Sequence, residues 1–250
     1  MITDPVCKSP ISERDAVAAS FHKGRVYLFC SEEHRDLFNT DPERYARGME
    51  VMALKVGVMG AASGDFTREA RANARELGRV IAERGMVVIT GAAPGLPLES
   101  AQGAREAGGL SIGISPALSL DEHLHVYHSP VDGFDVVIYT GSGLMGREIV
   151  NIRSSDIVLI VSGHSGTLGE FAIAYDEGKL IGVLQGTGGI ADIVPELVQA
   201  IDKQTGSAIV YDKDPERLID RTVDRYVNVH FRRPSVFVRH GQADSLHAAG

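Results

Sequence analysis

The sequence has only two cysteines, no tryptophan and fewer basic than acidic residues. Two cysteines in 250 residues exclude a disulfide-rich secreted scaffold, so we expect thiols or metal ligands in a reducing compartment. With 25 basic and 33 acidic residues, the net charge of −8 argues against nucleic acid as the main partner. Because no apolar run approaches the roughly 20 residues that span a bilayer and no secretory signal is visible, we expect a cytoplasmic protein without membrane contact.

The composition changes near residue 50 and predicts three parts. Residues 1–47 are polar and contain both cysteines, residues 54–227 alternate apolar runs with amphipathic segments, and residues 228–250 form a tail that is either loosely held or docked on a neighbour. The alternation predicts an α/β fold, a Rossmann-like parallel sheet with helices on both faces. The expected strands are 25–30, 54–59, 86–90, 110–115, 136–139, 157–161, 180–184 and 208–210; helices start at Ser31 and Pro42 and cover 65–84, 98–107, 143–154, 167–177, 190–203 and 214–225.

Three of the predicted strands are followed by loops of small residues, 60–64, 91–95 and 162–167. Ligands of a parallel sheet bind beyond the carboxyl ends of its strands, and small residues let backbone N–H groups approach an anion. Each loop alone is explained as an ordinary tight turn, and none matches G-x-G-x-x-G or a P-loop. Together they favour a phosphate-bearing ligand, with Gly60, Ala61, Ser63, Gly91, Gly95, Gly163, His164, Ser165, Gly166 and Thr167 as candidate contacts.

Thr167 and Glu170 stand at the predicted start of a helix. Their spacing fits a capping box, in which the two side chains satisfy each other's backbone N–H groups. It also fits a site in which Thr167 faces a bound anion and Glu170 reaches the same end of the helix.

Gly163-x-x-Gly166-Thr167-x-x-Glu170 resembles the P-G-G-x-G-T-x-x-E motif of the LOG proteins. The segment 144–148, Leu-Met-Gly-Arg-Glu, is spaced like the M-H-x-R-K helix of that family, and the loop 91–95 stands where the family has its second glycine-rich loop. The resemblance covers roughly residues 55–226. It implies a Rossmann-like nucleotide-binding fold, a homodimer or higher homo-oligomer, and sites near the subunit interface.

Some members of the LOG family hydrolyse the N-glycosidic bond of cytokinin nucleoside 5′-monophosphates to free base and ribose 5-phosphate. By position, the resemblance makes Arg147 and Glu170 the catalytic pair. A carboxylate can stabilise oxocarbenium character and orient water, and an arginine can hold phosphate or stabilise the leaving base. The alternative for Arg147 is a surface ion pair with Glu148 or another neighbour.

A second hypothesis is a non-catalytic carrier or sensor of a phosphorylated ligand. Gly146, Glu148 and His164 differ from the pattern of the hydrolases. The sequence there is similar to relatives that include molybdenum-cofactor carrier proteins, which also present a phosphate-binding edge. Molybdenum cofactor is therefore a candidate ligand, and the sequence leaves open whether the protein is an enzyme.

The N-terminal part resembles the YHS domain, a small metal-associated module. The resemblance rests on Asp4-Pro5-Val6-Cys7, on Cys30-Ser31-x-x-His34 and on the segment 41–45. Cys7, Cys30 and His34 would form a Cys₂His set suited to Zn²⁺ or Cu⁺, with His22 or water as a fourth ligand. The alternative is that both cysteines are small core residues and that His34 is packed, and a third hypothesis for the whole protein is metal sensing or delivery.

Three further histidines, His123, His125 and His128, are expected in an exposed loop. The alternative is a metal site made by two of them on one face of a strand.

Overall fold

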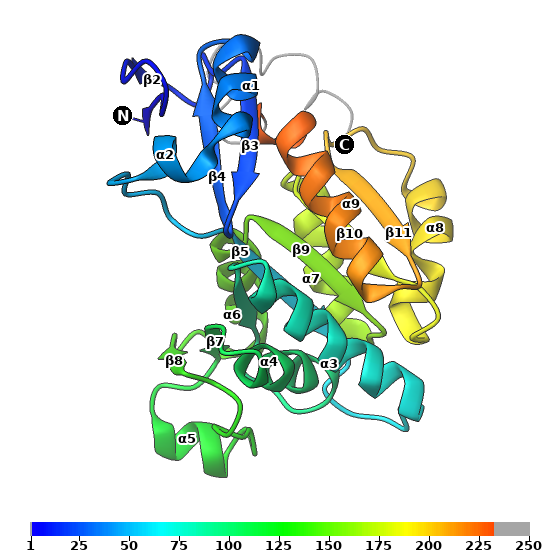
Figure 1. Cartoon of the computed structure of the whole chain (residues 1–250). Coiled ribbons are helices and arrows are strands. Elements are labelled where there is room, and N and C mark those ends of the chain that lie inside the picture. The colour runs from blue at the N-terminus through cyan, green and yellow to red at the C-terminus, as the bar shows by residue number, and fades with distance from the viewer. Residues whose placement is uncertain (1, 233–250) are drawn as a thin grey trace.

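The computed structural model describes residues 2–232, which form a small N-terminal module and a larger sheet domain (Figure 1). The domain contains a seven-stranded parallel sheet in the order β11-β10-β9-β5-β6-β7-β8. This confirms the predicted Rossmann-like α/β fold. Its strands are β5 (Lys55–Gly60), β6 (Val87–Thr90), β7 (Ser111–Ser115), β8 (Val136–Tyr139), β9 (Ile157–Val161), β10 (Leu180–Leu184) and β11 (Ala208–Asp212).

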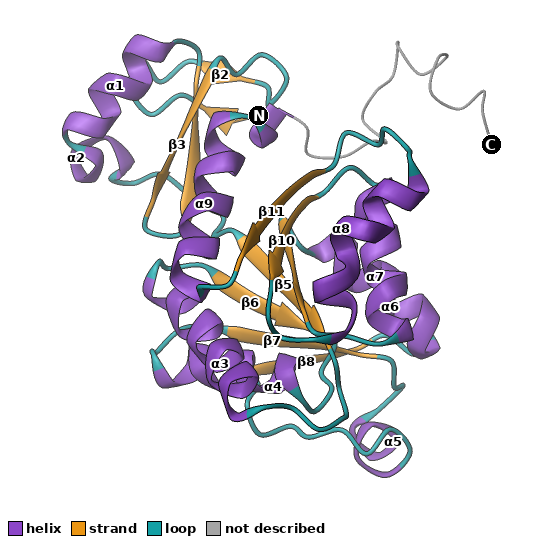
Figure 2. Cartoon of the chain, turned by 90° about the vertical axis from the view of Figure 1, so that its right-hand side faces the viewer, coloured by secondary structure: helices purple, strands orange, loops and turns teal. Residues whose placement is uncertain are grey.

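Helices cover both faces of the sheet (Figure 2). One face carries α3 (Arg68–Glu83), α4 (Leu96–Glu106) and α9 (Pro215–Asn228), and the other carries α6 (Gly143–Ser154), α7 (Ser165–Asp176) and α8 (Gly189–Ile201). The central strands β9 and β10 are buried on both sides, which explains their uninterrupted apolar sequences. A short helix α5 (Leu120–His125) follows β7, and a 3₁₀ turn, η1 (His230–Arg232), follows α9.

The order of the strands reverses between β5 and β9. From β5 the chain adds β6, β7 and β8 on one side and then returns to place β9, β10 and β11 on the other side. The loops that leave β5 and β9 therefore diverge at the carboxyl edge of the sheet. In sheets of this kind the crevice opened by such a reversal is where ligands bind.

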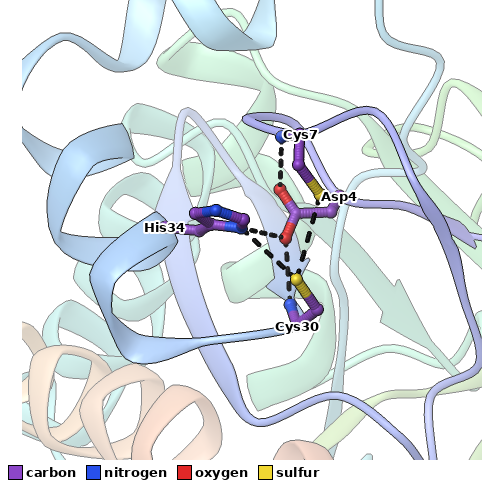
Figure 3. Close-up of side chains that lie close together, drawn as sticks. All are labelled: Asp4, Cys7, Cys30 and His34. Atoms are coloured by element: carbon purple, nitrogen blue, oxygen red, sulfur yellow. Dashed lines mark hydrogen bonds and ion pairs between the residues drawn. The ribbon is translucent and has the colours of Figure 1, made fainter.

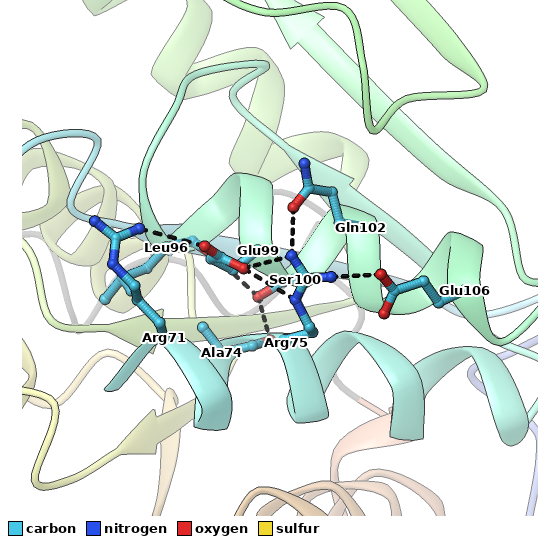
Figure 4. A network of polar contacts seen from close by, with 8 residues as sticks. All are labelled: Arg71, Ala74, Arg75, Leu96, Glu99, Ser100, Gln102 and Glu106. Atoms are coloured by element: carbon cyan, nitrogen blue, oxygen red, sulfur yellow. Dashed lines mark hydrogen bonds and ion pairs between the residues drawn. The ribbon is translucent and has the colours of Figure 1, made fainter. Parts of the chain in front are cut away.

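The helices α3 and α4 approach each other closely because glycine lies at their contacts. A Cβ atom on Gly78 would lie 1.8 Å from the carbonyl oxygen of Ser100, and one on Gly103 would lie 1.9 Å from that of Arg75. Figure 4 shows the polar contacts that join the two helices. The guanidinium of Arg75 donates to Glu99, Gln102 and Glu106, while the Ser100 hydroxyl donates to the Ala74 carbonyl.

The N-terminal module consists of two small antiparallel sheets and two helices. Its elements are β1 (Ile2–Thr3), β2 (Pro10–Ile11), β3 (Ala18–His22), β4 (Arg25–Phe29), α1 (Glu32–Thr40) and α2 (Pro42–Ala46). Ser31 caps α1 by accepting a hydrogen bond from His34 N–H, and Pro42 opens α2, both as predicted. Phe29 and Phe38 are completely buried and, with Tyr27, form the core of the module.

The strand β3 was not predicted, because its Ala-Ala-Ser sequence has low strand propensity. Its pairing with β4 is imposed by the Lys23-Gly24 turn, in which both residues have positive φ angles, 47° and 76°.

The module packs against the sheet domain through α9 and η1. Phe231 joins a buried cluster with Ile11, Ala19 and Leu28 of the module, and Tyr226 of α9 packs against the same cluster. The first residues of the predicted tail thus dock on the module; its remainder, 233–250, lies outside the described residues.

The expectation of an exposed loop for the three histidines was wrong for His123, and His125, although exposed, lies in the helix α5 rather than in a loop. His123 also lies in α5 and is completely buried. Both ring nitrogens of His123 have polar partners there: Nδ1 lies 2.8 Å from the Ser115 hydroxyl, and Nε2 lies 3.1 Å from the carbonyl oxygen of Pro130. His125 and His128 are exposed. Within residues 2–232, none of the three belongs to a cluster of metal-ligating side chains.

Candidate functional site

A cavity of about 160 Å³ opens at the reversal of strand order between β5 and β9. It is bounded by the loops that follow β5, β6 and β9 and by side chains of α6 and α7. Of the residues predicted from the sequence, Gly60, Ala61, Ser63, Gly91, Arg147, His164, Gly166, Thr167 and Glu170 line it.

Gly95, Gly163 and Ser165 do not line the cavity, although all three were predicted as ligand contacts. Gly95 begins α4 behind the first loop: the N–H of the next residue, Leu96, donates to the carbonyl of Ala61. Gly163 lies under the start of α8, where its carbonyl accepts from Ile190 N–H. Both glycines have positive φ angles, so they shape the loops.

Two non-glycine residues in these loops adopt left-handed backbone conformations. Ala92 has a φ angle of 52° and Ser162 one of 55°. Each is held by a threonine: Ala92 N–H donates to Thr90 Oγ1, and Ser162 N–H donates to Thr187 Oγ1 at 2.8 Å. Backbone strain of this kind is concentrated at binding and catalytic sites.

Arg147 reaches the cavity from α6 across Gly91. A Cβ atom at position 91 would lie 1.9 Å from Arg147 Nη1, so only glycine allows this path. The alternative of an ion pair with Glu148 is wrong, because Arg147 Nη1 lies 3.3 Å from Glu170 Oε1 and the Arg147 side chain is only 11% exposed. The Nε of Arg147 is buried without a hydrogen-bond partner.

Glu170 takes part in a buried polar network rather than in a capping box. The helix α7 begins at Ser165, with His164 as its N-cap and no side-chain capping bond, so Thr167 lies in its first turn. Glu170 Oε1 accepts hydrogen bonds from Arg147 and from Asn151 Nδ2, both at 3.3 Å. Burial raises the Glu170 pKa to about 7; Arg147 and Asn151 oppose this rise, and the nearby Glu148 carboxylate adds to it.

Two polar residues of this site, Asn151 and Glu148, were not predicted from the sequence. Asn151 is completely buried, and its Oδ1 has no hydrogen-bond partner. It stands four residues after Arg147, on the same face of α6, so helical spacing was the available signal. Glu148 lines the cavity and is buried, and burial raises its pKa.

A second cluster of functional side chains lies in the module (Figure 3). One ligand atom from each of Asp4, Cys7, Cys30 and His34 can be chosen so that all four lie within 4.8 Å of one another. The fourth group is Asp4 and not His22, whose Nε2 lies 3.3 Å from Glu43. Asp4 was missed because it stands three residues before Cys7 in a turn, where an aspartate is ordinarily a turn former.

Asp4 organises this cluster. Its Oδ1 accepts from the N–H groups of Val6 and Cys7, while its Oδ2 accepts from Cys30 N–H at 2.9 Å and lies 3.0 Å from His34 Nδ1. Although burial opposes ionisation, these hydrogen bonds lower the Asp4 pKa to about 2. The same contact raises the pKa of His34.

The spacing of the donor atoms in the cluster fits a tetrahedral metal ion. Two thiolates at about 2.3 Å from a tetrahedral Zn²⁺ are separated by about 3.8 Å. The Sγ atoms of Cys7 and Cys30 lie 3.8 Å apart, and Cys30 Sγ lies 3.3 Å from His34 Nδ1. The residues present therefore suit a soft or borderline metal such as Zn²⁺ or Cu⁺.

A larger hollow, of about 870 Å³, lies between the module and the sheet domain. It is bounded largely by the linker that precedes β5, together with Tyr226 and Phe231. None of the residues predicted from the sequence to bind ligand or metal lines it. The smaller cavity is the stronger candidate because its carboxyls, Glu148 and Glu170, are buried beside Arg147 and burial raises the pKa of both.

The parallel sheet, the loops at its reversal point and the buried ionisable pair define a Rossmann-like domain with a candidate ligand site, preceded by a small module with a candidate metal site. Residues 53–219 match the SLOG cluster4 family, and the chain belongs to this family. Residues 2–49 match the YHS domain. Both resemblances predicted from the sequence motifs are thereby confirmed.

Several known proteins are similar to this chain. An uncharacterized protein from Archaeoglobus fulgidus is 35% identical over 132 residues, which is 53% of this chain and 80% of that protein. The molybdenum cofactor binding protein from Rippkaea orientalis is 30% identical, with a TM-score of 0.57, over 68% of this chain and 96% of its own. The molybdenum cofactor carrier protein from Chlamydomonas reinhardtii is 28% identical, with a TM-score of 0.55, over 68% of this chain and 99% of its own.

Among the described residues, no helix is both long and apolar enough to cross a membrane.

The raised pKa of Glu170 predicts a pH-dependent effect of Glu170→Gln on stability. The pKa of this carboxyl rises from 4.5 to about 7 on folding. It therefore destabilises the folded state most above pH 7, where it must be ionised while buried. Glu170→Gln should therefore raise the free energy of unfolding at pH 8 by about 3 kcal/mol. The gain should shrink as the pH falls from 7 and disappear below pH 4.5, as urea unfolding at several pH values would measure.

Glu196→Gln, at an exposed position in α8, is the matched control and should have no pH-dependent effect. A gain for Glu170→Gln that is the same at pH 4 and pH 8 would contradict the burial of an ionisable carboxyl.

Proposed function

We propose that the cavity at the reversal of strand order binds a small phosphomonoester. The observation that carries this proposal is the convergence of Arg147 with the glycine-rich loops 60–64, 91–95 and 162–167, at the uncapped start of α7. Backbone N–H groups at a helix start and an arginine guanidinium are the donors that phosphate oxygens prefer. The phosphate lies against these loops, and the organic part of the ligand lies toward Glu170.

The similar molybdenum cofactor proteins support a carrier function. The similarity extends over nearly the whole length of those proteins, so it includes the edge on which the cavity lies. The ligand class that follows is a phosphorylated pterin such as molybdenum cofactor, held reversibly and released unchanged. The partners of such a protein are the small phosphorylated ligand and the proteins that deliver or receive it.

The contact of Arg147 with Glu170 supports a second candidate, hydrolysis of the N-glycosidic bond of a nucleoside 5′-monophosphate. With a pKa of about 7, Glu170 is partly ionised at neutral pH. It would orient water and stabilise positive charge at the sugar C1′ carbon, while Arg147 would hold the phosphate or the leaving base.

The four donor groups of the module support a metal-binding function. Cys7, Cys30 and His34 would hold Zn²⁺ or Cu⁺, with Asp4 either as fourth ligand or as the acceptor that orients His34. Asp4 and Cys7 follow β1, Cys30 follows β4, and His34 lies in α1. A metal bound by these three segments would stabilise a module whose own core is small.

An apolar surface beside the cavity supports a homodimer. On α6, Leu144, Met145 and Ile149 are exposed, by 56%, 75% and 40%. On the edge strand β8, Val136 and Ile138 are exposed on the face opposite Val137, which packs toward α4. This face of β8 and α6 would be covered by a second copy of the chain.

The binding proposal predicts that replacement of Arg147 weakens binding of the phosphorylated ligand. Arg147→Ala should weaken binding of AMP and of inorganic phosphate about tenfold or more, because it removes a charged hydrogen-bond donor from the cavity. Gly91→Ala should weaken binding as well, since its methyl group would displace Arg147 without removing the charge. Isothermal titration calorimetry measures both effects.

Arg153→Ala is the control, because Arg153 lies on the same helix and pairs with Glu177 on the surface. If the wild type binds neither AMP nor inorganic phosphate and retains no phosphorylated compound through purification, the binding proposal is wrong. Release of adenine that Glu170→Ala abolishes would establish the hydrolase, and a phosphorylated pterin retained through purification, without base release, would establish the carrier.

The metal site predicts about one Zn²⁺ or Cu⁺ per chain under reducing conditions. His34→Ala should lower the affinity at least tenfold, because it removes one ligand and leaves the two thiolates. Competition with a chromophoric chelator measures this affinity. His22→Ala, in the same module but outside the cluster, should leave it unchanged, and a wild type without stoichiometric metal would refute the site.

The dimer predicts that one buried charge separates the subunits. Met145→Asp should shift the mass measured by light scattering after gel filtration from two chains to one, because an unpaired carboxylate at an apolar interface is strongly unfavourable. Met52→Asp is the control, since Met52 is 83% exposed in the linker far from this face. A wild type that is a monomer at all concentrations would contradict the proposal.

A further inference from the structure

Glu148 is a second carboxylate in the candidate ligand cavity. It follows Arg147 on α6, is 5% exposed and lines the cavity. Its carboxylate faces two glycines of α7: a Cβ atom on Gly169 would lie 2.7 Å from Glu148 Oε2, and one on Gly166 would lie 3.5 Å from Oε1. The absence of side chains at these two positions leaves room for the carboxylate beside the first turn of α7.

No residue between 2 and 232 forms a hydrogen bond or an ion pair with Glu148. The neighbouring guanidinium of Arg147 contacts Glu170 instead. Buried carboxylates are ordinarily paired, because an unpaired one loses its hydration without compensation. Burial accordingly raises the pKa of Glu148, while Arg147 opposes the rise. Because Glu148 lines the cavity, a molecule that enters it can supply the missing hydrogen-bond donor.

The charges that line the cavity restrict what that molecule can be. Among residues 2–232, Arg147 is the one permanently cationic side chain that lines it. Glu148 and Glu170 are carboxyls, and His164 approaches from the loop after β9. Bare inorganic phosphate would meet the carboxyls as well as the guanidinium. It offers the carboxyls few hydrogen-bond donors. A ligand that also carries hydroxyl groups near its phosphate offers donors to the carboxylate and acceptors to Arg147.

We propose that Glu148 is a specificity-determining residue that accepts a hydrogen bond from a hydroxyl group of a sugar phosphate and disfavours bare phosphate. This inference rests on the proposed binding function and names the chemistry that the ligand must carry beyond its phosphate. Glu148 contacts the ligand directly, whereas Asn151 acts through Glu170 and is a positioning residue.

The test compares three probes, AMP, 2′,3′-dideoxy-AMP and inorganic phosphate, by titration calorimetry at pH 8. The wild type should bind AMP about tenfold or more tightly than the dideoxy compound, as expected for hydrogen bonds to a charged group. Glu148→Gln, which keeps the shape but loses the charge, should reduce this preference severalfold. Glu148→Leu, which cannot accept a hydrogen bond, should abolish it, while both variants should bind inorganic phosphate as well as or better than the wild type.

The preference between the two nucleotides separates this role from a structural one, because a damaged pocket would lose affinity for all three probes together. Glu196→Gln controls for the change in net charge. If the wild type binds AMP and dideoxy-AMP equally, or if both Glu148 variants keep the preference, the inference is wrong while the binding function stands. If the wild type binds neither AMP nor inorganic phosphate and retains no phosphorylated compound through purification, the binding function itself fails.

Discussion

The contact between the Arg147 guanidinium and the Glu170 carboxylate is the interaction on which the candidate site depends. It joins α6 to α7, the helices that flank β9, and it lies at the point where the strand order reverses. The contact requires glycine at position 91, because any side chain there would occupy the path of the guanidinium. The buried pair thus links the helix before β9 to the helix after it, beside the loop that follows β6.

This pair is incompletely satisfied, which distinguishes it from a structural ion pair. Arg147 Nε and Asn151 Oδ1 are buried without hydrogen-bond partners, and burial raises the pKa of Glu170 to about 7. A purely structural network would be more stable with apolar side chains of similar volume. The buried Arg147–Glu170 pair lies beside loops in which Ala92 and Ser162 have left-handed backbone conformations. Binding of a ligand explains this combination better than a contribution to the stability of the fold does.

The sequence allowed the fold to be predicted more completely than the site. Apolar runs located the strands of the large sheet, since a strand buried on both faces cannot be polar, and capping residues such as Ser31 located helix starts. Glu148 and Asp4 could not be found in this way, because their roles come from neighbours distant in the sequence, whereas the helical spacing of Asn151 from Arg147 was a signal that could have been used. His123 was misplaced for the same reason: it is buried by contacts with β7 and with the segment before β8, and its local sequence is polar.

The strand β5 runs from the module to the candidate ligand site. Leu54 N–H donates to the Gly24 carbonyl in the turn of the module's hairpin, and β5 begins at the next residue and ends at Gly60 in the cavity. Six residues of strand separate the two ends by about 17 Å. Because β5 lies between β6 and β9 in the centre of the sheet, it transmits stability more readily than displacement. Metal binding to the module would therefore strengthen the frame of the cavity without reshaping it, so the two sites would be linked through folding rather than through a switch.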